Sequence, residues 1–211
     1  MQLYEEERPS NWSQVVGQDK AIAQIDALRS RGLAGRAYWI TGQSGTGKTT
    51  IARLIAAEVA DSWATEEIDA GELTVDKLRQ LADCYRGRPI SGKGWAIIIN
   101  EAHGLRADQV RRLLVALESI PPFVAWIFTT TCDGHDRLFA DLDDAHPLLS
   151  RCQPIALTRQ GLAKPFATRL AEIARTRGLG NPTVEECYKL VQSQKNNFRG
   201  SLQALEAGAF R

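Results

Sequence analysis

GQSGTGKTT, residues 42–50, is the stretch that decides the fold of this chain. It fits the pattern G-x-x-x-x-G-K-[ST], with Gly42, Gly47, Lys48 and Thr49 at the fixed positions. The apolar residues before it predict a buried strand, and the residues after it have apolar side chains at helical spacing. A strand, a glycine turn and a helix in this order are the context in which the pattern forms a phosphate-binding loop. The flanks therefore favour nucleotide binding over a glycine turn that arose by chance.

The residue types of this loop suit a polyphosphate. Glycines let the backbone curl so that successive N–H groups point at an anion, and the following helix directs its positive end to the same place. We expect Lys48 to reach the β- and γ-phosphates of ATP, and the Thr49 hydroxyl to bind Mg²⁺. The residues expected around the phosphates are Gly42, Gln43, Ser44, Gly45, Thr46, Gly47, Lys48, Thr49 and Thr50.

The composition is that of an ordinary globular protein, with 44% hydrophobic and 24% charged residues among 211. This length suits one large domain, or a medium domain with a small one. The formal net charge of +1 gives no global basic field, so contact with DNA would need a local patch or several subunits together. No apolar run approaches the length of a membrane span, and the acidic N-terminus does not resemble a signal peptide.

The cysteines are far apart in the sequence and form no C-x-x-C pair. They are Cys84, Cys132, Cys152 and Cys187. We therefore expect neither a zinc site nor a disulfide framework, and we expect a reducing, cytoplasmic location.

Apolar runs predict an α/β fold with a parallel sheet. Strands are expected at 37–40, 66–69, 95–99, 124–129 and 154–157. The run 95–99 is apolar throughout, as expected of a parallel strand covered on both faces. Helices are expected from 17 to about 32, after the phosphate-binding loop, after the N-cap Thr74, and around 110–117. The first 16 residues look irregular, with Trp12, Val15 and Val16 as anchors.

After residue 158 the pattern changes to helices only. One helix is expected at about 162–177, a second from Thr183 with Glu186 completing a capping box, and a third around 198–205. We predict a nucleotide-binding α/β domain over 1–157, in which 1–17 form an arm, and a small helical domain over 158–211.

Asn100 and Glu101 follow the strongest predicted strand. In an open parallel sheet, ligands lie beyond the carboxyl ends of the strands. An apolar strand followed by two acidic residues is the second signature of P-loop NTPases. Its first acid holds the Mg²⁺ shell and its second polarises the attacking water. Glu101 keeps the second role, with a solvated turn residue as the alternative. Asn100 carries no charge, so we expect weaker Mg²⁺ affinity and slower hydrolysis. His103 suits a packing or loop residue better than a metal ligand.

Threonines follow the next strand, at 129–131. Threonine favours strands in any case. A hydroxyl at this strand end could instead contact the γ-phosphate or the water, and we favour Thr131, with Thr130 as the alternate.

Taken together, these residues resemble the AAA+ ATPases and, within them, the clamp-loader subunits of DNA replication. The opening 7–18 is similar to the arm that this family folds over the adenine, and the resemblance puts Arg8, Pro9, Val16 and Gly17 near the base. The segment 105–118, followed by Pro121 and Pro122, is similar to the helix after the family's second signature. The resemblance spans the whole chain and implies an AAA+ core followed by a helical lid.

Ser150-Arg151-Cys152 is the most specific part of the resemblance. Clamp loaders carry Ser-Arg-Cys here, and its arginine reaches the γ-phosphate of the neighbouring subunit. The resemblance thus implies that Arg151 is an arginine finger acting in trans, and the alternative is a surface arginine at a helix end. Arg199 matches the family's second sensor, a lid residue that contacts the nucleotide of its own subunit.

The sequence departs from the clamp-loader pattern at three places. Asn100 replaces an aspartate, the zinc-binding insert of some bacterial subunits is absent, and the sequence ends with the lid, before the family's collar domain. The last difference bears on the clamp-loader role but not on the AAA+ fold.

Two classes of function remain open. The first is an ATP-hydrolysing switch that works as a homo- or hetero-oligomer on DNA or a replication protein. Its DNA contacts could come from Arg106, Arg111 and Arg112, or from Arg86, Arg88 and Lys93, and a solvated face is the alternative for each group. The second is a nucleotide-binding scaffold that hydrolyses little, which Asn100 motivates. A helicase-loader or transposition-type AAA+ regulator would share every motif.

Overall fold

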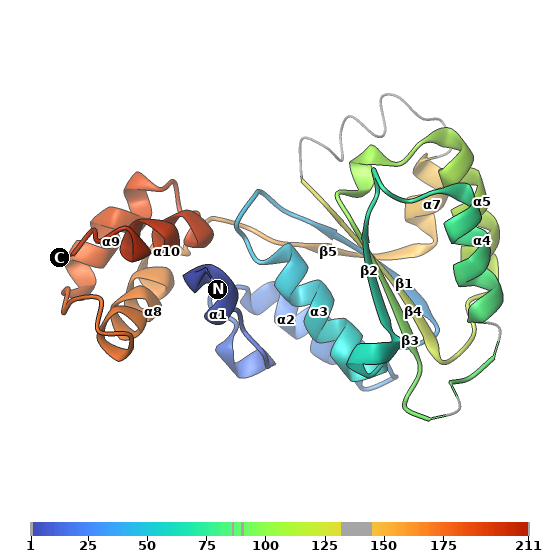
Figure 1. The fold of residues 1–211 in the computed structure, drawn as a ribbon, viewed down its shortest axis with the longest axis horizontal. Coiled ribbons are helices and arrows are strands. Elements are labelled where there is room, and N and C mark those ends of the chain that lie inside the picture. The colour runs from blue at the N-terminus through green and yellow to red at the C-terminus, as the bar shows by residue number, and fades with distance from the viewer. Residues whose placement is uncertain (1, 86, 90, 132–144, 211) are drawn as a thin grey trace. The chain divides into compact units, whose positions relative to one another are not determined.

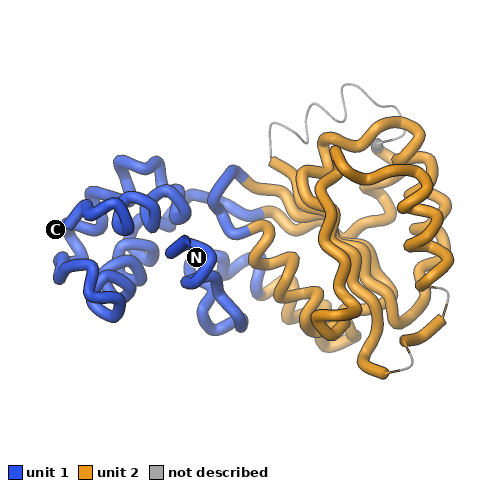
Figure 2. The backbone as a smooth tube through the Cα atoms, in the orientation of Figure 1, with its two compact units in different colours: residues 1–22, 43–47, 157–211 blue, residues 23–42, 48–156 orange. Residues whose placement is uncertain are grey.

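The structure is a computed structural model of residues 1–211, in which residues 2–85, 87–89, 91–131 and 145–210 are described (Figure 1). It divides into two compact units (Figure 2). The sheet unit consists of Ala23–Gly42 and Lys48–Ala156. The helical unit consists of Met1–Ile22, Gln43–Gly47 and Leu157–Arg211. The predicted domains 1–157 and 158–211 stay a prediction, since compactness groups 1–22 and 43–47 with the C-terminal helices.

A parallel sheet forms the centre of the sheet unit. In the described residues it has five strands in the order β2-β3-β4-β1-β5, and the neighbouring strands are parallel. The strands are β1 (Arg36–Thr41), β2 (Thr65–Asp69), β3 (Trp95–Asn100), β4 (Val124–Thr130) and β5 (Cys152–Ala156). The predicted α/β class is therefore confirmed.

Strand β5 begins two residues earlier than the sequence predicts. Cys152 is buried and lies opposite Ala37 in the ladder with β1. The polar Gln153 separates Cys152 from the run that begins at Pro154, and for that reason the pattern placed the strand at 154–157.

Helices cover the sheet, as expected for parallel strands buried on both faces. They are α2 (Asp19–Arg29), α3 (Lys48–Val59), α4 (Val75–Cys84), α5 (Ala107–Glu118) and α7 (Ala145–Ser150), with 3-10 turns at Ser62–Ala64 and Ala102–Gly104. Helix α3 packs on β3 and β4, and Figure 1 shows α4 and α5 on the other face. Thr74 caps α4 as predicted, because its Oγ1 accepts a hydrogen bond of 3.1 Å from Lys77 N.

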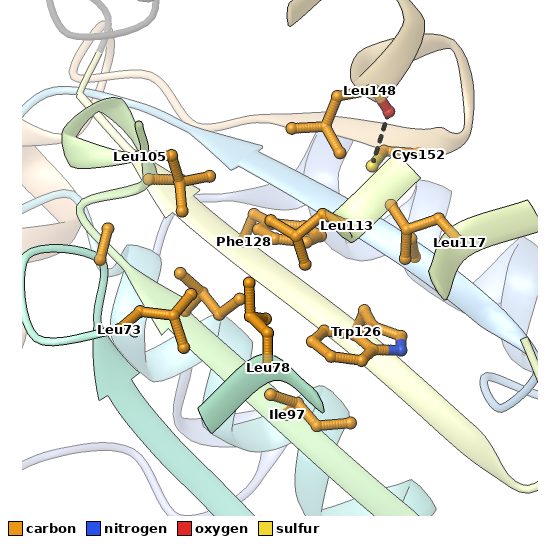
Figure 3. Packing of buried hydrophobic residues seen from close by; sticks show 14 of the residues in the cluster. Leu73, Leu78, Ile97, Leu105, Leu113, Leu117, Trp126, Phe128, Leu148 and Cys152 are labelled. Atoms are coloured by element: carbon orange, nitrogen blue, oxygen red, sulfur yellow. Dashed lines mark hydrogen bonds between the residues drawn. The ribbon is translucent and has the colours of Figure 1, made fainter. Parts of the chain in front are cut away.

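The apolar cluster under α4 and α5 shows how the sequence pattern becomes a core (Figure 3). On α5, Val110, Leu113 and Leu117 are buried one turn apart, whereas Val115 is 69% exposed. They meet alternate residues of the sheet, including Trp126 and Phe128, because every second side chain of a strand points to the same face. Cys152 belongs to the same cluster. Its thiol donates to Leu148 O at 3.3 Å, and burial raises its pKa to about 12.

The helical unit is built from both ends of the sequence. Its C-terminal helices are α8 (Ala163–Thr176), α9 (Val184–Ser193) and α10 (Phe198–Glu206), and α1 (Leu3–Glu6) packs with them. Leu3 is 5% exposed, and its N–H donates to Glu206 Oε1 at 3.3 Å. The Glu7 carboxylate accepts from Arg169 at 3.3 Å and from Arg177 at 2.6 Å.

The prediction of an irregular N-terminus is wrong over part of its length. Residues Leu3–Glu6 form α1, and Trp12–Gln14 form a 3-10 turn. A four-residue helix carries no amphipathic period that a sequence window could detect. The capping box of α9 is confirmed: Thr183 N donates to Glu186 Oε2 at 2.8 Å, and Glu186 N donates to Thr183 Oγ1 at 3.3 Å.

Among the described residues, none of the helices has the length and apolar character that a membrane crossing requires. Cys84, Cys152 and Cys187 are free thiols. Cys132 lies outside the described residues, as does Arg86.

Candidate functional site

The predicted phosphate-binding loop connects β1 to α3. Gly45 and Gly47 have φ of 78° and 97°, in the left-handed region that glycine adopts without a steric penalty. Thr46 closes the turn, since its N–H and its Oγ1 donate to Gln43 O at 3.3 and 2.8 Å. A Cβ on Gly45 would clash with Asn197 Oδ1. The tip of the loop therefore requires glycine for two reasons, its backbone angle and its close neighbour.

Lys48 is a buried charge at the start of α3. Its side chain reaches back across the loop, and Nζ donates to Gly42 O at 2.9 Å. The residue is 7% exposed, and a buried ammonium needs polar partners to offset its lost hydration. Thr49 and Thr50 follow in the first turn of α3 and are half-buried, where helix N–H groups without intrahelical partners favour an anion.

Glu101 follows β3 in an unusual backbone conformation. Its φ and ψ of 50° and 47° are left-handed, which costs energy for a residue with a Cβ. Its carboxylate is about half exposed, and Oε2 lies 3.4 Å from His103 Nδ1. The same Nδ1 lies 3.2 Å from Thr130 Oγ1. His103 thus joins Glu101 to β4, a role that the sequence analysis missed and that only the Glu-x-His spacing could have suggested.

Asn100, at the end of β3, is held on both sides. Its Nδ2 donates to Glu67 Oε1 at 2.8 Å, and its Oδ1 accepts from Thr129 Oγ1 at 2.9 Å. Glu67 is in turn bound by Arg53 of α3. The sequence analysis missed Glu67 and Arg53, because a single sequence does not show the register between β2 and β3.

Two of the three threonines are buried in β4. Thr129 and Thr130 are 1% and 0% exposed. Thr131 is half-buried and comes directly after the strand. Since side chains alternate between faces, Thr130 points to the face of His103, and Thr129 to the face of α3. The role of Thr131 stays a prediction.

Arg151 directly follows α7. Its guanidinium is partly exposed and is bonded within its own chain. Nη1 donates to Pro147 O at 2.9 Å, and Nη2 donates to Glu118 Oε1 at 3.1 Å.

The predicted adenine and lid residues lie in the helical unit. The guanidinium of Arg199, on α10, is 5.2 Å from the centre of the Tyr4 ring. Arg8 pairs with Glu5, with Nε to Oε2 at 3.2 Å. Gly17 has a φ of 74° and lies against Leu162. Val16 is half-buried beside the apolar cluster of that unit, and Pro9 precedes the 3-10 turn.

The site residues are thus distributed over both units. The sheet unit contains Gly42, Lys48, Thr49, Thr50, Asn100, Glu101, Thr131 and Arg151. Arg151 is not brought to the others, because it precedes β5, whose first residue pairs with Ala37 near the start of β1, whereas the phosphate loop follows the end of β1. The helical unit contains Gln43, Ser44, Gly45, Thr46, Gly47, Arg8, Pro9, Val16, Gly17 and Arg199.

The donor set suits magnesium better than a metal that needs a cage of protein ligands. Within the described ranges, no three His, Cys, Asp or Glu residues are grouped so that they could hold a metal ion. Mg²⁺ keeps several waters and is commonly held by one or two protein groups together with substrate phosphates. A hydroxyl at Thr49 and an amide oxygen at Asn100 fit that requirement.

Comparisons with known proteins relate the chain to a family and to a fold. The model of the "ATPase family associated with various cellular activities (AAA)" matches residues 38–158. The DNA polymerase III subunit gamma/tau of Mycoplasma pneumoniae is 28% identical over 97% of this chain and 32% of that protein. The same subunit of Mycoplasma genitalium is 31% identical over 72% of this chain and 28% of that protein. The chain therefore spans about a third of the length of these relatives.

Among solved structures, the Thermotoga maritima RuvB Holliday junction branch migration motor superposes with a TM-score of 0.71. The match covers 95% of this chain and 64% of that one at 19% identity, so the likeness concerns the fold alone. The sequence matches confirm the resemblance to AAA ATPases and, more distantly, to gamma/tau subunits.

Proposed function

Because the chain belongs to the AAA family of ATPases, we propose that it binds ATP with Mg²⁺ and hydrolyses it at an interface between two subunits. The observation that carries the proposal is the arrangement of the sheet unit. Lys48 at the phosphate loop and the pair Asn100–Glu101 follow two strands of one parallel sheet. The carboxyl edge of such a sheet is where ligands bind.

Each residue has a distinct part in this proposal. Lys48 would exchange its bond with Gly42 O for phosphate oxygens, because a charge-assisted bond to an anion is stronger than one to a neutral carbonyl. Glu101 would orient and polarise the attacking water. Thr131 would contact that water or the γ-phosphate. Alternation along β4 would place Thr131 on the face of Thr129 and Asn100, whereas Thr130 faces His103.

Thr49 and Asn100 would hold Mg²⁺, directly or through its waters. When bound, the ion would neutralise charge that develops on the phosphate oxygens. The family resemblance assigns the adenine arm to Arg8, Pro9, Val16 and Gly17, and the second sensor to Arg199 of the lid.

Arg151 would act on the nucleotide of a neighbouring subunit. Its partial exposure supports this role, and so do its contacts, which are to surface groups. An arginine supplied in trans stabilises the charge of the transferring phosphoryl group and makes hydrolysis depend on assembly.

We place this activity in DNA replication or repair, as a clamp-loader-like switch, because the curated relatives are DNA polymerase III subunits. The chain covers only a third of their length, so the target remains part of the proposal. Contact with DNA through Arg106, the N-cap of α5, and Arg111 and Arg112 within the helix would make binding fall steeply with salt.

A mixing experiment tests the central proposal. Lys48→Ala should not bind ATP but still carries the arginine finger Arg151. Arg151→Ala should bind ATP but has no arginine finger. Each should be inactive alone in single-turnover hydrolysis, and their mixture should recover activity that rises with protein concentration. Arg79→Ala, an exposed arginine of α4 with no role in the proposal, is the control and should behave as wild type. Absence of recovery in the mixture would refute action in trans.

A second candidate function is a nucleotide-binding scaffold with little turnover. The contacts of Asn100 favour it, because its amide is engaged on both sides and carries no charge toward a metal. ATP binding by wild type without hydrolysis at any protein concentration would select the scaffold.

A further inference from the structure

Four polar side chains form a continuous hydrogen-bonded row on the α3 face of the sheet. The row runs from Arg53 on α3 to Glu67 on β2, Asn100 on β3 and Thr129 on β4. We propose that Glu67 is a positioning residue of the Mg²⁺ site, which fixes the orientation of the Asn100 amide and makes asparagine, rather than aspartate, the residue that fits there. This inference rests on the proposed function.

The contacts define which way the Asn100 amide points. The Glu67 carboxylate can only accept hydrogen bonds, so the group that faces it at 2.8 Å must be the NH₂. Thr129 Oγ1 donates to Oδ1 on the other side at 2.9 Å. A flipped amide would turn its oxygen toward the carboxylate and lose the bond to Glu67, although the Thr129 hydroxyl could still accept from the turned NH₂. Oδ1 is therefore held in place, and it retains a second lone pair for a metal-bound water.

Arg53 binds the Glu67 carboxylate through two hydrogen bonds. Its Nε donates to Oε2 at 2.7 Å, and its Nη2 donates to Oε1 at 3.1 Å. The paired, planar geometry fixes the carboxylate plane. Oε1 accepts from both Arg53 and Asn100, so the helix and the strand are joined through one oxygen.

The row also connects to the phosphate loop through α3. Thr49 precedes Arg53 by four residues, so the two lie on the same face of the helix, about 6 Å apart along its axis. The face that carries the expected Mg²⁺ ligand Thr49 is therefore the face that Arg53 ties to Glu67 and Asn100.

The same geometry explains the missing aspartate. A carboxylate at position 100 would bring an oxygen within hydrogen-bonding distance of Glu67 Oε1 without a donor between them. Like charges at this separation repel, so an acid at 100 would break the row unless Glu67 were neutral.

The test measures how strongly Mg²⁺ assists nucleotide binding. A slowly hydrolysed ATP analogue is titrated calorimetrically in EDTA and again in Mg²⁺, and the ratio of the two Kd values is the metal coupling. Glu67→Ala should lower this coupling by about tenfold, as loss of an outer-shell partner does, and should leave the Kd in EDTA unchanged. Glu67→Gln keeps an oxygen for Asn100 and should restore most of the coupling.

Glu66 provides a matched control on the same strand. It faces the other side of the sheet and pairs with Lys77 at 2.5 Å. Glu66→Ala removes the same charge and also breaks an ion pair, yet it should leave the metal coupling at the wild-type value.

A second pair of variants tests whether two carboxylates at positions 67 and 100 repel each other. Asn100→Asp should lower the coupling, whereas Asn100→Asp with Glu67→Gln should return it to wild type or above. The inference would be overturned if Glu67→Ala kept the metal coupling of the wild type. It would also be overturned if Asn100→Asp alone raised the metal coupling as much as the double variant does. If Glu67→Ala does not fold, the comparison of Asn100→Asp with the double variant decides whether the inference holds. A wild-type chain that binds no nucleotide in either buffer would overturn the proposed function itself, and the inference with it.

Discussion

Arg151 Nη2 donates to Glu118 Oε1 at 3.1 Å, so the proposed arginine finger is bonded to a carboxylate of its own chain. A finger that acts in trans has to give up this partner for the phosphate of its neighbour. The Arg151 side chain is partly exposed and that of Glu118 largely exposed, so solvent screens the pair and it contributes at most about 1 kcal/mol.

Loss of the Glu118 charge should therefore favour assembly. We expect Glu118→Gln to strengthen self-association in the presence of ATP by up to about fivefold, the equivalent of 1 kcal/mol. Sedimentation velocity with a slowly hydrolysed analogue measures it. Asp108→Asn, on the same helix, is the charge-matched control. An effect no larger than that of the control would show that Glu118 does not compete with the phosphate.

Gly45 and Gly47 should respond differently to the same substitution. Both have left-handed backbone angles, so alanine strains each by about 1 kcal/mol or more. Only at Gly45 does the new methyl group meet another residue, Asn197, whereas no atom lies within 4 Å at Gly47. Gly45→Ala should lower the melting temperature more than Gly47→Ala. Equal shifts would mean that the loop tip does not pack against Asn197 in solution.

Lys48→Ala should remove most of the affinity for ATP. Loss of a charged hydrogen bond to phosphate costs about 3 kcal/mol, or a rise in Kd of about a hundredfold. Lys93 also donates to a backbone carbonyl, Ala57 O at 3.4 Å, but is exposed. Lys93→Ala should bind as wild type. Unchanged affinity in Lys48→Ala would refute the phosphate-loop assignment.

The cap of α9 should make stability depend on pH. Hydrogen bonds from the Thr183 N–H and hydroxyl lower the pKa of Glu186 in the folded chain. A lowered folded pKa gives stability that is present above the unfolded value, about 4.3, and is lost as the pH falls through the folded value. Glu186→Gln should therefore flatten the acid limb of the urea midpoint against pH. Glu185→Gln, its neighbour in the same first turn, should leave that limb as in wild type.

Local patterns predicted those parts of the molecule that depend on neighbours in sequence. The phosphate loop, the apolar strand at 95–99 and the caps at Thr74 and Thr183 each follow from spacing along the chain. Strand β5 was misplaced because its first residue is buried by pairing with β1, not by an apolar run of its own.

The missed site residues depend on contacts across the sheet. Glu67 meets Asn100 because β2 and β3 pair in one particular register, with Asp69 opposite Asn100. A shift of one residue would place Glu66 on that face instead. No period within β2 distinguishes these two glutamates, so the sequence predicts the edge of the site but not the partner of Asn100.

The helical unit has consequences for how this protein can be dissected. Leu3 and Glu206 are joined by a hydrogen bond, so the opening residues and the last helix belong to one packed body. In a fragment that begins at residue 158, the C-terminal helices would lack Leu3. The apolar surface on which Leu3 packs would then be exposed to water. A short linker from the end of α10 to the start of α1, with new termini opened elsewhere, would preserve that body where simple truncation would damage it.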